Sequence, residues 1–350
     1  MLRLSIKSIT SIGVSMALTI KDELALAWRS LARTEADEGW RKIRIASIDS
    51  MNIMAGICYP SGREAILVSF SGLPISKTLN FPQGRGFKVT HEKFEDDSRT
   101  WITITRSAYG AFDLFLLMAV DVVEFLKNSK SDTDSVRYQD LLGRIKAWQH
   151  FMKPGRDGLT LEEEIGLAGE VLVLHELINT GIDIDSALEC WVGPDDGLQD
   201  FEIGIGAIEV KSTLAETEFP AKIQSIEQLD DSQRKPLFVA GCRFSVSETG
   251  KTLVEIIRSL EEIANKEVRL IQLIELKLIG AGYHHSHAER YTRKLINTDI
   301  CFWLVDGDFP RLIASNVPSG ITSINYTIDL DSVNSKVDSL TTALKMLKGI

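Results

Sequence analysis

The spacing of apolar residues predicts a first part of the chain that is built mainly from strands. Apolar residues recur at helical spacing over 21–33, so a short amphipathic helix is expected there. Runs rich in β-branched and aromatic residues follow, separated by turn residues such as those at 60–62. These runs cover 41–48, 52–59, 63–70 and 101–105. The pattern predicts an antiparallel sheet with a strongly apolar helix over 112–126 packed on it.

The most polar stretch of the chain lies at 128–135 and has the composition of an exposed linker. A chain of 350 residues is long enough for two hydrophobic cores, so the linker is expected to join two domains. We therefore predict a disordered extension over 1–20, a β-rich N-terminal domain over 21–135 and a second domain over 136–350.

The second domain contains a helix that is expected to pack closely on a sheet. Thr160 and Glu163 match a capping box, which places the start of this helix at Leu161. Gly166 and Gly169 carry no side chain and would let its backbone approach neighbouring strands.

Glu170 is the one polar side chain between Ile165 and Leu174. A carboxylate on a helix that is otherwise apolar nearly all round needs a partner if it is buried, because an unpaired buried charge is costly. A metal ion or Lys211 would supply that partner. The alternative is that Glu170 lies at a solvent-facing edge of the helix.

The segment that follows is typical of a β-hairpin with acidic and basic side chains. A short strand carrying Asp200 leads into a glycine turn at 204–206, and a second strand is expected over 207–214. Because side chains alternate across a strand, Glu209 and Lys211 share one face. Folding the hairpin about its turn brings Asp200 close to that face.

Two carboxylates beside a lysine suit a magnesium-dependent phosphodiesterase. Mg2+ prefers hard oxygen ligands and usually takes one or two carboxylates, with water and substrate phosphate in its other positions. A metal held in this way polarises a phosphodiester and acidifies a bound water. Lys211 would orient that water or stabilise the charge that builds on the phosphorane. The alternative is a surface hairpin in which Glu209 and Lys211 form an ordinary ion pair.

The pattern of Asp200, eight residues, and then Glu209-Val210-Lys211 resembles the core motif of the PD-(D/E)XK nucleases. This superfamily of metal-dependent phosphodiesterases includes restriction enzymes. The motif's proline is absent before Asp200, where Gln199 stands, and Asp195 after Pro194 is the competing acid. Asp200 is preferred because it opens the strand that feeds the hairpin, whereas 193–197 has turn composition.

The segments on either side of the hairpin extend the resemblance over most of the chain. Residues 164–174 look like the first core helix of that fold, and 223–230 look like its third strand running into the next core helix. With 309–312 and a closing strand near Tyr326, the chain is similar to an uncharacterised PD-(D/E)XK family from prokaryotic restriction and defence gene clusters.

The resemblance implies an α+β or α/β fold, in which a β-rich N-terminal domain precedes a restriction-endonuclease-like core with a mixed sheet flanked by helices. It implies Mg2+ as cofactor, with Mn2+ able to substitute. The implied metal ligands and catalytic residues are the carboxylates of Glu170, Asp200 and Glu209, the backbone carbonyl of Val210, and Lys211 as the catalytic cation. Gln224 or Gln228 would bind a phosphate or hold Lys211 in place, as polar residues after the lysine do in relatives, or would be ordinary surface residues.

The chain carries a net charge of -10, which excludes a protein that wraps DNA non-specifically, since such binding depends on many Lys and Arg contacts to phosphate. The resemblance and the hairpin together predict a Mg2+-dependent DNA endonuclease from a restriction or phage-defence system. The alternative is a non-catalytic DNA-binding or assembly subunit that keeps the nuclease fold. The acidic balance favours dependence on partner proteins such as an ATPase or a methyltransferase, and a homodimer is left open.

The four cysteines, at positions 58, 190, 242 and 301, form no C-x-x-C pair. A zinc site or a disulfide framework is therefore not expected, and isolated thiols suit a reducing cytoplasm. No apolar stretch approaches the length of a membrane span, so no membrane partner is expected.

Overall fold

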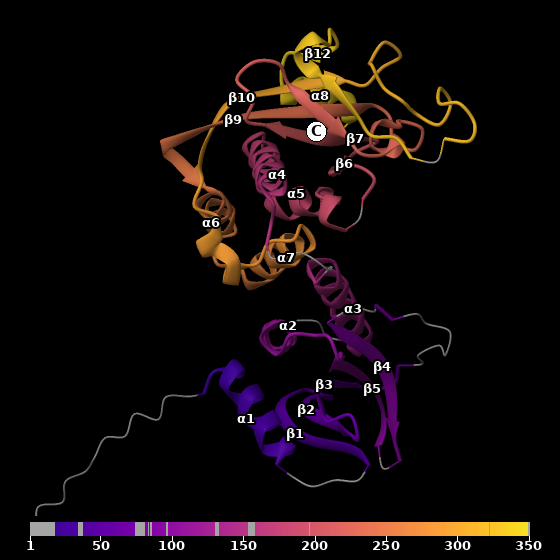
Figure 1. The fold of residues 1–350 in the computed structure, drawn as a ribbon, viewed down its shortest axis with the longest axis vertical. Coiled ribbons are helices and arrows are strands. Elements are labelled where there is room, and N and C mark those ends of the chain that lie inside the picture. The colour runs from indigo at the N-terminus through magenta and orange to yellow at the C-terminus, as the bar shows by residue number, and fades with distance from the viewer. Residues whose placement is uncertain are drawn as a thin grey trace, which may run out of the picture. The chain divides into compact units, whose positions relative to one another are not determined.

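The structure of the chain is a computed structural model (Figure 1). It describes residues 18–348 apart from 34–37, 74–80, 83, 85, 96, 130–132, 153–157, 196 and 322. The expected disordered extension falls largely outside the described residues. The chain divides into an N-terminal unit, Met1–Tyr138, and a C-terminal unit, Gln139–Ile350.

The N-terminal unit is a five-stranded antiparallel sheet with two helices. The strand order is β1-β2-β3-β5-β4, and α1 packs against both α2 and β2. The indole of Trp28 on α1 packs against Phe112 and Phe115 of α2 and donates a hydrogen bond to the carbonyl of Ala65 at 3.0 Å. The elements are α1 Ile20–Ala32, β1 Gly39–Ile48, β2 Met51–Tyr59, β3 Arg63–Phe70, β4 Phe87–Phe94, β5 Asp97–Arg106 and α2 Phe112–Asn128.

The C-terminal unit is built on a mixed five-stranded sheet of order β12-β10-β9-β7-β6. Strands β7 and β9 run parallel, whereas the other neighbouring pairs are antiparallel. This mixed sheet agrees with the predicted fold class. Its strands are β6 Phe201–Ile203, β7 Gly206–Thr213, β9 Leu237–Thr252, β10 Lys294–Leu304 and β12 Lys336–Val337. A separate two-stranded sheet pairs β8, Pro220–Ile223, with β11, Tyr326–Asp329.

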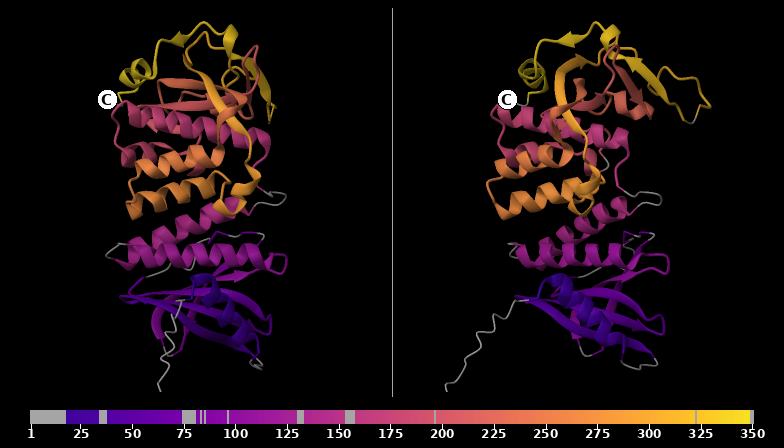
Figure 2. Two further views of the ribbon diagram at one scale, coloured as in Figure 1. Left: turned by 90° about the vertical axis from the view of Figure 1, so that its left-hand side faces the viewer. Right: turned by 60° about the vertical axis from the view of Figure 1, so that its left-hand side comes forward.

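Helices of the C-terminal unit gather on one side of the mixed sheet, where α4, α5, α6 and α7 lie in layers (Figure 2). The sheet made by β8 and β11 packs on the other face, around Trp303 and Val239. The helices are α3 Asp134–Phe151, which begins in the N-terminal unit, and α4 Leu161–Asn179, α5 Ile184–Cys190, α6 Leu253–Ile263, α7 Val268–Gly280 and α8 Leu340–Leu347.

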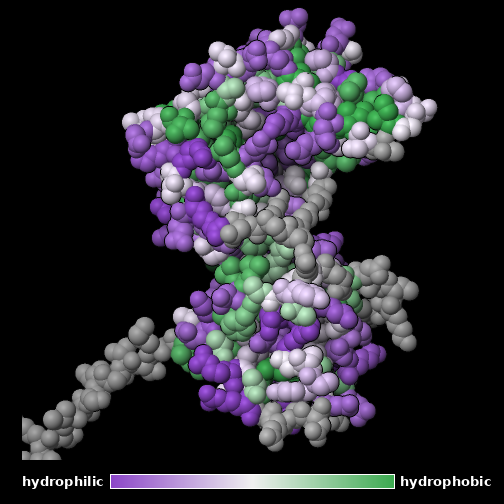
Figure 3. All heavy atoms as spheres, viewed as in Figure 1, coloured by the Kyte–Doolittle hydropathy of each residue, from purple (hydrophilic) through white to green (hydrophobic). Residues whose placement is uncertain are grey.

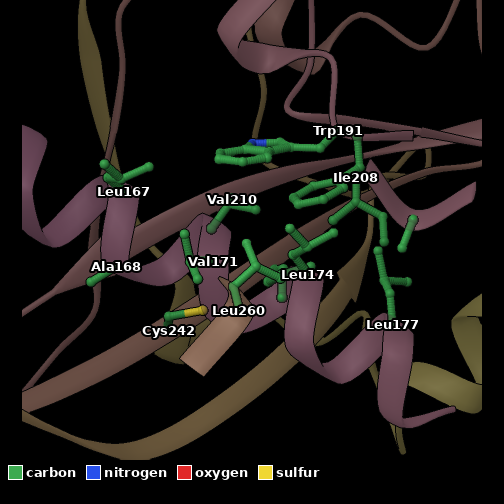
Figure 4. Close-up of a cluster of buried hydrophobic side chains, with 14 of the residues drawn as sticks. Leu167, Ala168, Val171, Leu174, Leu177, Trp191, Ile208, Val210, Cys242 and Leu260 are labelled. Atoms are coloured by element: carbon green, nitrogen blue, oxygen red, sulfur yellow. The ribbon is translucent and has the colours of Figure 1, made fainter. Parts of the chain in front are cut away.

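Helix α4 starts where the sequence predicts. Thr160 and Glu163 form both hydrogen bonds of a capping box. Side chains of α4, including Leu167, Val171 and Leu174, meet those of β7 in the main core (Figure 4). The fully buried members of this core explain why the helix is apolar nearly all round.

Only one of the two helix glycines permits close packing on the sheet. A Cβ atom at Gly169 would lie 2.0 Å from the Ser212 hydroxyl of β7, whereas a Cβ at Gly166 would meet nothing within 4 Å. The prediction that both glycines allow close approach is therefore correct for Gly169 and wrong for Gly166.

Two predicted elements differ from the structure. The third core strand predicted at the start of 223–230 corresponds to β8, which lies outside the mixed sheet and pairs with β11. The strand beside β7 is β9, and residues 226–229 form one short 3-10 turn in place of a core helix.

The surface is mixed in character. The visible face of the C-terminal unit carries both hydrophilic and apolar areas (Figure 3). None of the helices in the described ranges is long and apolar enough to cross a membrane. All four cysteines are free.

Candidate active site

The hairpin predicted from the sequence is present and ends in a tight glycine turn. Strands β6 and β7 pair antiparallel, with Ile203 opposite Gly206. Gly204 adopts a φ of 53°, a conformation that glycine tolerates at little cost, and a Cβ at Gly206 would lie 2.0 Å from the Pro236 carbonyl. The turn therefore fixes the register that places β6 beside β7.

Asp200 stands directly before β6 and is tied to β7 through its side chain. Its carboxylate Oδ2 accepts a hydrogen bond from the backbone N–H of Val210 at 2.6 Å. Its own carbonyl accepts from the N–H groups of Val192 and Gly193. Val210 lies between Glu209 and Lys211, so this hydrogen bond brings Asp200 to the part of β7 that carries the other charged residues.

Glu209 and Lys211 form a buried ion pair. The Lys211 ammonium lies 2.7 Å from Glu209 Oε1, and the side chains are 3% and 13% exposed respectively. The alternative of a solvated surface pair therefore fails, because a surface pair would leave both heads in water. By strand alternation both residues share the face of Ala207, which packs with Phe219 and Trp303 on the side covered by β8 and β11.

Glu170 of α4 points into the molecule toward this hairpin. Its Oε2 accepts a hydrogen bond from the indole N–H of Trp191 at 2.7 Å. Trp191 is fully buried and stacks on Phe201 of β6, so its N–H has a fixed direction. The alternative of a solvent-facing Glu170 does not agree with this position.

The three carboxyl groups lie close enough to perturb one another. Burial, followed by the charge of Asp200, raises the pKa of Glu209 to about 8. Burial and then the charge of Asp200 also raise the pKa of Glu170 well above its usual range, although the Trp191 hydrogen bond opposes this. Burial raises the pKa of Asp200, against the opposing effects of Lys211 and the Val210 N–H.

Lys211 stays protonated in this setting. Burial acts to lower its pKa, but the charges of Glu209, Asp200 and Glu170 together with the hydrogen bond to Glu209 raise it overall. The site thus holds one buried cation, Lys211, among three acids. Burial and mutual repulsion favour the protonated forms of the acids, so together they carry fewer than three negative charges near neutral pH.

Asp195, the competing motif acid, lies elsewhere. Its side chain is 53% exposed and pairs with Lys277 at 2.5 Å, and the same ammonium donates to the Trp191 carbonyl. It therefore supports the loop that carries Trp191 and does not join the carboxylate cluster. Between the two candidates, the structure groups Asp200 with Glu209.

The side chains of Gln224 and Gln228 do not join the carboxylate cluster. The side-chain oxygen of Gln228 accepts from the backbone N–H of Gln224 at 2.9 Å, so Gln228 closes a turn after β8. Gln224 is exposed and lines a surface groove. Trp191 is the residue that the sequence did not reveal, because no spacing rule connects a tryptophan at the end of α5 to an acid on α4.

The donor set suits a hard divalent cation. Among the residues that the structure describes, no three His, Cys, Asp or Glu side chains are placed as a ready metal-binding group. Trp191, Val210 and Lys211 each hold one oxygen of Glu170, Asp200 and Glu209 respectively. Carboxylate oxygens are nonetheless the ligands that Mg2+ prefers, and a bound cation would favour the charged forms of these acids, whose pKa values burial raises.

Comparison with known proteins gives one family. A family model described as "Putative PD-(D/E)XK family member, (DUF4420)" matches residues 24–331. No curated protein and no solved structure matches the chain. The matched range contains every charged residue of the cluster.

Proposed function

The chain belongs to this PD-(D/E)XK family, and on that premise we propose that it is a divalent-metal-dependent DNA endonuclease that hydrolyses phosphodiester bonds. The observation that carries the proposal is the buried ion pair of Lys211 with Glu209 at 2.7 Å, next to two further acids. A structural ion pair would not need those acids, because a further buried acid costs stability when it is charged.

Each residue of the cluster has a distinct role in this proposal. Glu170, Asp200 and Glu209 would hold Mg2+, or Mn2+ in its place, with the carbonyl of Val210 as a further oxygen ligand. When bound, the metal would polarise the phosphodiester and lower the pKa of a bound water. Lys211 would stabilise the negative charge that builds on the phosphorane, since its ammonium is fixed before the reaction and need not be reorganised.

The surrounding hydrogen bonds orient the ligands. The indole N–H of Trp191 holds one oxygen of Glu170, and the N–H of Val210 holds one oxygen of Asp200. Groups that orient metal ligands in this way typically matter by about 10- to 100-fold in metal affinity. Trp191 is thus a positioning residue.

A second candidate is a subunit that binds DNA or assembles with partners without cutting. The net charge of -10 favours it, because the chain has little excess basic charge to hold DNA alone. The same charge is compatible with a nuclease that works beside an ATPase or methyltransferase in a restriction or phage-defence system. The resemblance of the sequence to a PD-(D/E)XK family from such gene clusters is the basis for that setting.

Cleavage of plasmid DNA in Mg2+ or Mn2+ tests the proposal, with the partner proteins added where they are known. Lys211→Met keeps the length of the side chain and removes its charge, so we expect cleavage to fall by about 100- to 1,000-fold. Lys235→Met is the control, because that lysine is 77% exposed and outside the cluster. Equal cleavage by the wild type and Lys211→Met would overturn the proposal.

The non-catalytic alternative gives a different result in the same experiment. If the protein only binds DNA, neither the wild type nor either variant cleaves, and Lys211→Met loses at most one phosphate contact. That loss would make the salt dependence of DNA affinity shallower by about one unit of slope.

A further inference from the structure

A polar groove lies beside the candidate active site, between the start of α4 and the small sheet of β8 and β11. Its volume is about 590 Å³ and it is open to solvent. Seven polar residues contribute to its lining: Glu162, Lys222, Gln224, Ser323, Asn325, Tyr326 and Thr327.

The walls of the groove are held by hydrogen bonds. Lys222 lies opposite Thr327 in the β8–β11 ladder. In the amide orientation that satisfies both of its polar atoms, Asn325 donates to the carbonyl of Gln224 at 2.9 Å. The hydroxyl of Tyr326 accepts from the N–H of Leu312 at 3.0 Å, which fixes the ring. The groove is therefore a built surface of the C-terminal unit.

The groove and the carboxylate cluster adjoin one another. Lys211 lies on the face of the mixed sheet that β8 and β11 cover, and β7 contacts β8. Burial raises the pKa of the Tyr326 phenol, and the Leu312 N–H, Arg311 and, least of the three, Lys211 act against this rise. On α4, Glu162 precedes Glu170 by two turns, which is about 12 Å at 1.5 Å per residue.

This separation corresponds to a few nucleotides of one DNA strand at about 3.4 Å per nucleotide. A groove of about 590 Å³ has the size of a small-ligand site, so it can admit a segment of one strand. Its polar lining, with one tyrosine ring, suits a sugar-phosphate chain.

Lys222 and Glu162 form an exposed ion pair in the lining of the groove. The two side chains are 60% and 69% exposed, and pairs so exposed contribute little to stability. A phosphate carries the same charge as Glu162 and can replace it as the partner of Lys222.

We propose that the groove binds the strand flanking the scissile phosphate, with Lys222 contacting a backbone phosphate and Glu162 acting as the anion that this phosphate displaces. This inference rests on the proposed function in taking DNA as the substrate. In this proposal Glu162 lines the groove and yet opposes DNA binding, because its carboxylate competes with the phosphate for Lys222.

Binding of a nuclease-resistant phosphorothioate single-stranded oligodeoxynucleotide, followed by fluorescence anisotropy in Mg2+, tests the assignment. Loss of one phosphate contact on a single strand lowers the salt slope by about 0.7, which corresponds to about fourfold in affinity near 0.15 M salt. We therefore expect Lys222→Gln to weaken binding by about fourfold with a shallower slope. Glu162→Gln should strengthen binding by a similar factor, because it frees Lys222 and removes a like charge.

The exposed pair of Lys294 with Glu248 supplies matched controls outside the groove, as Lys294→Gln and Glu248→Gln. Neither control should change affinity by more than about 1.5-fold, roughly the size expected of a distant screened charge. The groove assignment is overturned if Lys222→Gln and Glu162→Gln bind like the wild type, if they shift in the same direction, or if the wild type does not bind the oligonucleotide.

A parallel cleavage assay separates this inference from the proposed function. If the groove variants shift binding in opposite directions while the wild type never cleaves, the groove stands as a DNA site and the nuclease proposal falls. If the wild type cleaves and the groove variants match it in both affinity and KM, the nuclease proposal stands and the groove assignment falls.

Discussion

The contact between α4 and β7 can be tested with two alanine substitutions in the same helix. Gly169 faces β7 so closely that an added Cβ would lie 2.0 Å from the Ser212 hydroxyl and 3.4 Å from the Cβ atoms of Ser212 and Cys242. Gly166 lies three residues earlier and an added Cβ there would meet nothing within 4 Å. The two variants therefore change helix propensity equally and differ in packing.

The expected energies follow from that difference. Replacing glycine by alanine within a helix stabilises by about 0.5–1 kcal/mol, so Gly166→Ala should raise stability by that amount. Overpacking a close contact costs about 1–3 kcal/mol, so Gly169→Ala should destabilise on balance. Because the gain in helix propensity is the same for both, the two variants should differ by the packing cost alone, about 1–3 kcal/mol, or about 2–12 °C in Tm at about 2–4 °C per kcal/mol for a unit of this size.

Thermal unfolding followed by circular dichroism and by tryptophan fluorescence measures this difference. The double variant Gly169→Ala with Ser212→Ala should recover most of the loss, because it removes the clashing hydroxyl. A displacement of α4 would also move Glu170, and small misplacements of such a group are costly for activity. The reasoning is refuted if Gly169→Ala is as stable as Gly166→Ala, or if Ser212→Ala gives no recovery.

Three further predictions concern the cluster itself. Trp191→Phe keeps the stacking on Phe201 but removes the hydrogen bond to Glu170. Mn2+ affinity measured by calorimetry should therefore fall by about tenfold, and an unchanged affinity would contradict the positioning role of Trp191. Folding raises the pKa of Glu209 from 4.5 to about 8, so its contribution to stability is complete below pH 4.5 and is lost as the pH rises toward 8. Without divalent metal, the free energy of unfolding should therefore fall by a few kcal/mol over that range, at about 1.4 kcal/mol per pH unit. Chemical denaturation at several pH values in EDTA measures this fall, and a flat profile would oppose it. Glu209→Gln should abolish the part of the fall that comes from this group and should remove Mn2+ binding.

The sequence predicts the hairpin and its charged residues because the rules involved are local. Strand alternation places Glu209 and Lys211 on one face, and a glycine turn leaves few ways to bring back Asp200. The start of α4 at Leu161 is likewise set by Thr160 and Glu163, which lie within one turn of each other.

Features that depend on distant partners were not accessible in the same way. The segment at 222–225 has strand composition, but nothing local shows that β8 pairs with β11, about 100 residues later, in place of the core strand β7. Gly166 and Gly169 look alike in sequence, and only the position of Ser212 separates them. Trp191 is found as a partner of Glu170 only when α5 and α4 are placed together.

Titration with Mn2+ by calorimetry tests the central claim that the carboxylate cluster is a metal site. Asp200→Asn keeps an oxygen for the Val210 N–H and removes the charge, whereas Asp195→Asn makes the same change at the exposed acid that pairs with Lys277. We predict that the wild type and Asp195→Asn bind Mn2+ with equal affinity and that Asp200→Asn loses binding by at least about tenfold, in line with loss of a metal-ligating charge. Absence of Mn2+ binding by the wild type, or loss of binding in Asp195→Asn with retention in Asp200→Asn, would contradict the claim.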